Sequence, residues 1–338
     1  MRGRLLTVCL FVALVLALSL LLDAVVFLVL PPQFRGEEKQ VLIPKGSTFH
    51  EVVRVLNEEG LLRSPTRFYL MARVLGISGR VKAGEYELNT SMMPPVILHK
   101  LVTGDVVKYR VTIPEGYTIR QIAVRLEEGG IIDGQEEFFH GAFSSDFAAR
   151  VGIAGESVEG YLFPDTYLFS KGIAPAEVIK TMVENFKRIY VPDFSRRAAE
   201  LGMTDHEVVT LASIIEKETG VSDERPLISA VFHNRLKRGI PLCSDPTVIY
   251  GIEGFDGNLK KRDMAKRTPY NTYLIRGLPP GPIANPGRSS LVAALYPASV
   301  PYLYFVSRND GSHHFSATLR EHNEAVWRYQ KRGRRAVQ

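Results

Sequence analysis

The longest hydrophobic pattern in the chain lies at its N-terminus. Residues 5–30 are apolar apart from three positions, one of which is Asp23. This run exceeds the roughly 20 residues that cross a bilayer core, and it ends in Leu-Pro-Pro-Gln without a small-x-small cleavage site. A signal peptide has a shorter apolar core, so the pattern predicts an uncleaved transmembrane anchor over 5–30. Because Asp23 is costly inside a membrane, the span is expected to end near Leu22, with 24–30 at the interface.

A repeat follows the anchor. The segment 41–68 matches 111–138 at nine of 28 positions, including the Ile-Pro-x-Gly turn and the glycine that follows each amphipathic stretch. Each copy predicts a short strand, a turn, and an amphipathic helix ended by glycine.

The first copy predicts more structure after its helix. A second helix is expected over 66–75 and a strand over 84–88. The β-α-α-β order resembles a LysM glycan-binding module. The alternative is an α+β spacer that binds no ligand.

One helix over 204–219 carries the strongest candidate for chemistry. Thr204 and Glu207 form a capping-box pattern, and Gly220 is expected at the C′ position. Glu218 continues the apolar stripe of Leu211, whereas Glu216 is offset from it by about 200°. A carboxyl held against apolar side chains keeps its proton to higher pH and can protonate a glycosidic oxygen. The alternative is a solvated glutamate, or one that is paired with a neighbour such as Lys217.

Composition limits the other possibilities. The 338 residues suggest two or three domains, and 45% hydrophobic with 23% charged residues is typical of a globular protein. The net charge of +6 is mild and no nucleic-acid motif occurs, so no nucleic-acid partner is predicted. Two cysteines provide neither a disulfide framework nor a zinc site. Adjacent His313 and His314 would point to opposite faces of a strand, so we predict no metal and no cofactor.

Several motifs then occur in one order along the chain. They are "ASIIEKET" at 212–219, "VFHNRL" at 231–236, "DPTVIYG" at 245–251, "YNTY" at 270–273, "GLPPGPIANPG" at 277–287 and "PYLYF" at 301–305. Together they resemble the membrane-bound endolytic murein transglycosylases, the YceG-like family, over essentially the whole chain. The resemblance implies cleavage within peptidoglycan glycan strands that leaves 1,6-anhydro-N-acetylmuramyl ends. It also implies that the catalytic glutamate is Glu218.

Further residues are candidates for supporting roles. A sugar face is part apolar and part hydroxyl, so aromatic rings beside amides suit it; we expect substrate contacts from Tyr250, Asn271, Tyr273 and Asn285. The alternative for the tyrosines is packing with a satisfied hydroxyl.

Three more residues flank these motifs. Asp245 could be a second carboxylate, as in a hydrolase, but we expect it to cap the segment that follows it. Asn234 and Arg235 are expected to brace the catalytic helix.

The predicted fold class is α+β, with a transmembrane helix, a LysM-like module and a lysozyme-like or YceG-like catalytic domain. The expected boundaries are 1–4 for a cytoplasmic tail, 5–30 for the anchor, 38–106 for the LysM-like module, 107–158 for the second repeat and linker, 159–330 for the catalytic domain and 331–338 for a basic tail.

Arginines before the anchor favour a cytoplasmic N-terminus. The chain would then be a single-pass protein of the bacterial inner membrane, with its catalytic domain in the periplasm or outside the cell. Its partners would be peptidoglycan, the membrane and, by family, peptidoglycan synthases that make the strands it terminates or trims. Two alternative functions remain open: a lysozyme-like peptidoglycan hydrolase, and a membrane-tethered glycan-binding scaffold without catalysis.

Overall fold

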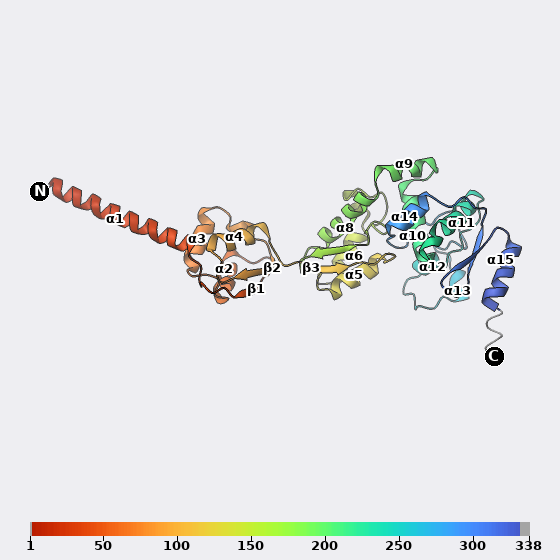
Figure 1. Ribbon diagram of the computed structural model, residues 1–338, viewed down its shortest axis with the longest axis horizontal. Helices are drawn as coiled ribbons and strands as arrows, with labels where there is room; N and C mark the ends of the chain where they lie inside the picture. The colour runs from red at the N-terminus through yellow and green to blue at the C-terminus, as the bar shows by residue number, and fades with distance from the viewer. Residues whose placement is uncertain (1, 332–338) are drawn as a thin grey trace. The chain divides into compact units, whose positions relative to one another are not determined.

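The structure is a computed structural model that describes residues 2–331 (Figure 1). Met1 and all but the first residue of the predicted basic tail lie outside the described residues. The fold is mixed α+β, as predicted. It divides into two compact units, of which the first comprises Met1–Tyr109 with Leu168–Ile173 and the second comprises Arg110–Tyr167 with Ala174–Gln338.

The N-terminal apolar run forms a single helix, α1 (Arg2–Val29). Its Thr7–Val29 part is long and apolar enough to cross a membrane, with a mean hydropathy of 2.9. The end of α1 packs on the first unit: an Asp23 carboxylate oxygen lies 2.9 Å from Arg67 Nη1, and Phe27 is only 8% exposed. The last turns of α1, where the sequence predicted an interfacial segment, therefore contribute Phe27 to a protein core.

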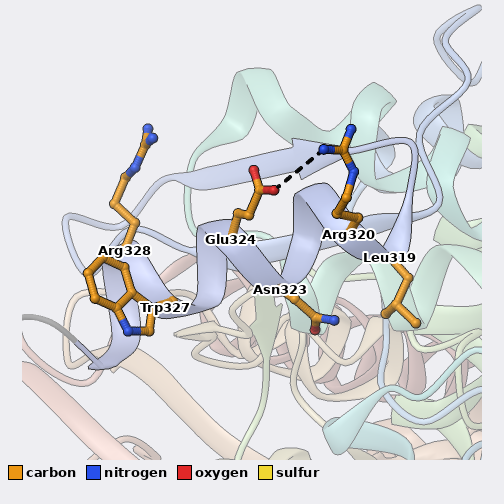
Figure 2. Close-up of a pocket in the computed structure, with 6 residues that line it drawn as sticks. All are labelled: Leu319, Arg320, Asn323, Glu324, Trp327 and Arg328. Atoms are coloured by element: carbon orange, nitrogen blue, oxygen red, sulfur yellow. Dashed lines mark ion pairs between the residues drawn. The ribbon is translucent and has the colours of Figure 1, made fainter.

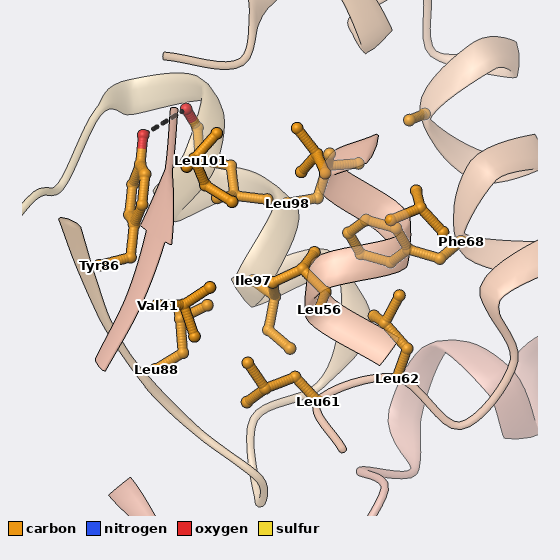
Figure 3. Packing of buried hydrophobic residues seen from close by; sticks show 14 of the residues in the cluster. Val41, Leu56, Leu61, Leu62, Phe68, Tyr86, Leu88, Ile97, Leu98 and Leu101 are labelled. Atoms are coloured by element: carbon orange, nitrogen blue, oxygen red, sulfur yellow. Dashed lines mark hydrogen bonds between the residues drawn. The ribbon is translucent and has the colours of Figure 1, made fainter. Parts of the chain in front are cut away.

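The first unit has the predicted β-α-α-β order. Its elements are β1 (Glu38–Ile43), α2 (Phe49–Glu58), α3 (Pro65–Val74), a 3-10 turn η1 (Ser78–Arg80), β2 (Gly84–Asn89) and α4 (Pro94–Thr103). Strands β1 and β2 are antiparallel, with Glu38 opposite Asn89 and Ile43 opposite Gly84. Their inward residues meet α2, α3 and α4 in one apolar core (Figure 3). In that core the Tyr86 hydroxyl donates a hydrogen bond to the Leu101 carbonyl, at 3.2 Å.

The remaining elements, in chain order, are β3 (Tyr109–Thr112), α5 (Ile119–Glu128), α6 (Gln135–Ala142), α7 (Ser145–Arg150), β4 (Thr166–Phe169), α8 (Pro175–Ile189), α9 (Pro192–Glu200), α10 (Asp205–Glu218), η2 (Ser222–Glu224), α11 (Arg225–Lys237), α12 (Asp245–Tyr250), α13 (Lys261–Met264), α14 (Arg288–Leu295), β5 (Tyr304–Ser307), β6 (His313–Ser316), α15 (Leu319–Val326) and η3 (Trp327–Lys331). Strand β3 pairs with β4, and β5 pairs antiparallel with β6. Helix α10 packs against α11 and α14.

The two copies of the repeat fold alike locally. Each helix begins with a capping box, at Thr48 in α2 and at Thr118 in α5. Each is followed by a glycine with positive φ, 72° at Gly60 and 64° at Gly130, a conformation that costs glycine little. The predicted strand–turn–helix pattern is confirmed in both copies.

Candidate functional site

Helix α10 places Glu218 at its last position. The predicted capping box at Thr204 starts the helix, and Leu211, Ile214 and Ile215 are completely buried. Thr219 is the C-cap residue, so Gly220 lies at the predicted C′ position, although its φ is not positive. It is instead a point of close approach, because a Cβ there would lie 2.6 Å from the Gly311 carbonyl oxygen of the β5–β6 turn.

A hydrogen bond fixes the Glu218 carboxyl. Its Oε1 accepts from Ser244 Oγ at 2.6 Å, and the backbone N–H of the buried Ser244 donates to Thr272 Oγ1 at 3.0 Å. Burial raises the pKa of Glu218, and the negative charge of Asp245 raises it further. The Ser244 hydrogen bond and the positive charges of His313 and Arg235 oppose that rise in pKa.

The first glutamate of the motif, Glu216, has different partners. Its carboxylate accepts from the Gly287 backbone N–H at 3.0 Å and lies 3.4 Å from Arg225 Nη2. Lys217 pairs with neither glutamate, since its ammonium donates to the Gly116 carbonyl at 3.3 Å. The predicted separation of Glu216 from Glu218 around the helix is confirmed, and Glu216 is held in a structural ion pair.

Asp245 does not cap α12. Ser244 occupies the N-cap position, and no side-chain capping hydrogen bond forms there. The exposed Asp245 carboxylate accepts instead from the Tyr273 hydroxyl at 2.6 Å, a bond that, with burial, raises the pKa of Tyr273. The capping prediction is wrong. Tyr273 and Asp245 form a polar pair whose charge acts on Glu218.

Two predicted substrate-binding amides are internal. Asn271 is completely buried and donates to the Met264 and Lys266 carbonyls, at 2.9 and 2.7 Å. Asn285 is also completely buried, and its amide bonds the Leu162 N–H and the Tyr117 carbonyl. Neither side chain is accessible to a glycan, so the expectation of direct contact is wrong for both. They shape loops around the site.

Asn234 and Arg235 brace loops rather than the catalytic helix. The Asn234 amide donates to the Val300 and Tyr302 carbonyls, each at 2.9 Å. The Arg235 guanidinium donates to the Leu303 carbonyl at 2.7 Å and to the Leu242 carbonyl at 2.6 Å. Arg235 thereby connects Leu303, directly before β5, with the loop that contains Leu242 and Ser244.

A second buried acid, Glu159, was not predicted as a site residue. Both its carboxylate oxygens accept from the Ile119 N–H at 3.1 Å, and it accepts from Asn285 Nδ2 at 2.9 Å and from the Tyr250 hydroxyl at 3.2 Å. Burial raises its pKa from 4.5 to about 7 against the effect of these hydrogen bonds. The one sequence signal was an acidic residue directly before the aromatic "GYLF" segment.

Replacing Glu159 by glutamine should change how stability depends on pH. A raised pKa means that the stabilising contribution is complete below pH 4.5 and is lost as pH rises through about 7. At pH 8 the Glu159→Gln variant is therefore expected to be more stable than wild type by up to about 3 kcal/mol. Denaturant unfolding at pH 4.5 and pH 8 measures this, with the exposed Glu184→Gln as control. An equal difference at both pH values would contradict it.

Tyr250 belongs to an open cleft of about 980 Å³ in the second unit. The residues that line it are Thr118, Arg120, Gln121, Phe143, Glu159, Lys217, Pro246, Ile249, Tyr250, Gly251, Ile252, Glu253, Gly254, Phe255, Tyr270 and Ile283. We call this the α5–α12 cleft. Helix α12 links it to Glu218, because the N-cap Ser244 holds the Glu218 carboxyl and Tyr250 at the other end lines the cleft.

Another depression lies along the C-terminal helix. It is lined by Leu319, Arg320, Asn323, Glu324, Trp327 and Arg328 (Figure 2). It contains none of the predicted site residues. Among residues 2–331, no group of histidine, cysteine and acidic side chains is arranged to hold a metal ion.

Known proteins resemble this chain over most of its length. The model of the YceG-like family matches residues 41–328. An endolytic murein transglycosylase of Bacillus subtilis (strain 168) is 33% identical over 304 residues, which cover 85% of this chain and 83% of that protein. One from Streptococcus pneumoniae serotype 2 (strain D39) is 29% identical, and the match covers 84% of this chain but 57% of that longer protein. A crystal structure of a YceG-like protein from Listeria monocytogenes superposes with a TM-score of 0.59 at 32% identity, covering 85% of this chain and 98% of that one.

Proposed function

This chain belongs to the YceG-like family, and from that premise we propose that it is an endolytic murein transglycosylase with Glu218 as its catalytic acid and base. It is a lyase that cleaves the glycan strands of peptidoglycan. The observation that carries the proposal is the Glu218 carboxyl, desolvated at the end of α10 and oriented by Ser244. A group in this setting keeps a proton to donate and has a fixed direction in which to donate it.

The reaction needs only one carboxyl group. Protonated Glu218 donates its proton to the glycosidic oxygen as the C1–O bond breaks, and positive charge develops at C1 of the muramyl sugar. The Glu218 carboxylate then takes the proton of that sugar's own C6 hydroxyl, and O6 bonds to C1. The products are a free hydroxyl on the leaving sugar and a 1,6-anhydro end, and the enzyme regains its proton.

The neighbours of Glu218 suit both halves of this cycle. Burial favours the neutral acid at the start, whereas the Ser244 hydroxyl and the positive charges of Arg235 and His313 favour the carboxylate after proton donation. Burial is the largest of these effects, so the pKa of Glu218 is raised overall, and the groups that favour the carboxylate limit the rise.

Asp245 supports a second candidate, a hydrolase. Its exposed carboxylate lies close enough to raise the pKa of Glu218, so it could activate water in place of the C6 hydroxyl. We favour the lyase because the Tyr273 hydroxyl already occupies one Asp245 oxygen at 2.6 Å.

Replacing Asp245 by asparagine separates the two candidates. The lyase predicts that Asp245→Asn still releases anhydro ends. Because the lost negative charge had raised the pKa of Glu218, the alkaline limb of the pH–rate profile should move to lower pH. Mass spectrometry of digested glycan checks this: reducing ends from wild type, lost in the variant, would instead support the hydrolase. No cleavage by wild type would leave only a glycan-binding scaffold.

The remaining assignments belong to the same proposal. The first unit acts as a LysM-like glycan-binding module, supported by its β-α-α-β order, and the second unit contains the lysozyme-like catalytic part. Helix α1 anchors the chain in the bacterial cytoplasmic membrane with its N-terminus inside, supported by the apolar Thr7–Val29 segment. The catalytic part then faces the wall, where it terminates or trims nascent strands beside peptidoglycan synthases.

A further inference from the structure

The α5–α12 cleft combines aromatic rings with cations that lack acidic partners. Arg120 is exposed, and its guanidinium lies over the rings of Phe139 and Phe143, with centroid distances of 5.6 and 5.5 Å. Lys217 is also exposed. Within the described part of the chain, neither Arg120 nor Lys217 forms an ion pair. Two cations at one cleft that have no ion-pair partner favour an anionic ligand.

The acidic residues of the cleft do not cancel this charge. Glu159 is buried beneath it, and its oxygens accept hydrogen bonds from three protein groups. Glu253 is exposed at the rim. The loop between the lining residues Phe255 and Tyr270 contains five cationic and two acidic side chains. Cationic side chains therefore outnumber acidic ones in the loop that borders the cleft.

The cleft lies a short distance from the proposed catalytic acid. Helix α12 begins directly after Ser244, which holds Glu218, and its sixth and last residue is Tyr250 in the cleft. At 1.5 Å per residue, this helix is about 9 Å long. Lys217, in the cleft lining, directly precedes Glu218. A substituent on a sugar bound at Glu218 can therefore reach the cleft.

We propose that the α5–α12 cleft binds the carboxylates of the peptide stems on the glycan, through Arg120 and Lys217. This inference rests on the proposed function. In a peptide-bearing strand the sugars are neutral, because the lactyl carboxyl is in amide linkage, and the free carboxylates are on the peptides. Arginine forms charge-assisted hydrogen bonds with such groups. The apolar and aromatic lining accommodates the uncharged part of a stem.

Matched substrates isolate the charge. Both are soluble peptide-bearing glycan with acetylated peptide amino groups, and in one the peptide carboxylates are then converted to methylamides. We expect wild type to cleave the anionic substrate with a kcat/KM about tenfold above that for the amidated one. A factor of about ten is what the loss of one charge-assisted hydrogen bond is expected to cost. In the double variant Arg120→Gln/Lys217→Gln, the ratio of the two kcat/KM values should fall to about one. Lys180→Gln, which neutralises an exposed cation of α8, should keep the wild-type ratio.

Each other outcome has a definite meaning. If wild type cleaves both substrates equally, the inference is overturned while the proposed function stands. If the double variant keeps the wild-type ratio, the preference exists but the cleft does not provide it, and the assignment is overturned. If wild type cleaves neither substrate, the proposed function fails and this inference fails with it. Because the readout is a ratio, any loss of rate from changing Lys217 beside Glu218 cancels.

Discussion

The Glu218→Gln variant should fold normally and lose glycan cleavage, with a rate reduced by about a thousandfold or more. Glutamine keeps the shape of the side chain and can still accept the Ser244 hydrogen bond, which is 2.6 Å long in the wild type. It has no proton to transfer to the leaving oxygen and cannot become the base that the second step requires. Release of anhydro muropeptides from isolated glycan, followed by mass spectrometry, measures the loss. Thermal unfolding measures the fold.

Glu216→Gln is the matched control, two positions earlier on the same helix. Glu216 contacts Arg225 and the Gly287 N–H, so its replacement weakens an ion pair and should lower stability while cleavage continues. Full activity of Glu218→Gln would reject the assignment. Loss of cleavage in Glu216→Gln alone, with a normal unfolding transition, would transfer the catalytic role to the first glutamate of the motif.

Features that depend on neighbouring residues could be predicted from the sequence. The capping box at Thr204, the buried stripe of Leu211 and the different faces of Glu216 and Glu218 all follow from helical geometry. The repeated strand–turn–helix units follow in the same way. Each pattern involves residues that are a few positions apart, so the chain needs no distant partner to specify it.

Features that depend on distant partners could not be predicted. Glu159 receives hydrogen bonds from residues 40, 91 and 126 positions away, and no spacing rule connects these residues. The sequence predicts a substrate contact for Asn285, but its side chain is buried and its amide donates to the Glu159 carboxyl and the Tyr117 carbonyl. Asp245 does not cap α12, and its carboxylate instead accepts a hydrogen bond from the Tyr273 hydroxyl, 28 positions later in the chain. Tertiary contacts decided each of these cases.

Two truncations test the anchor and locate its end. Removal of residues 1–22 deletes most of the apolar segment Thr7–Val29 but retains Asp23 and Phe27. The protein is expected to move completely from the membrane pellet, after an alkaline wash, to the soluble fraction. The protein should still cut isolated glycan, because its catalytic part is elsewhere in the chain. Persistence in the washed pellet would contradict the assignment of α1 as the sole anchor.

Removal of residues 1–30 should also release the protein from the membrane, but this protein should be less stable than the one that begins at Asp23. This truncation deletes Phe27, which is 8% exposed in the core of the first unit, and leaves Arg67 without Asp23. Loss of one buried phenylalanine costs about 2 kcal/mol, whereas the half-exposed ion pair adds little. Denaturant unfolding should therefore show the shorter protein less stable than the one that begins at Asp23. Equal stabilities would mean that Phe27 does not support the first unit and that the last turns of α1 serve the membrane instead.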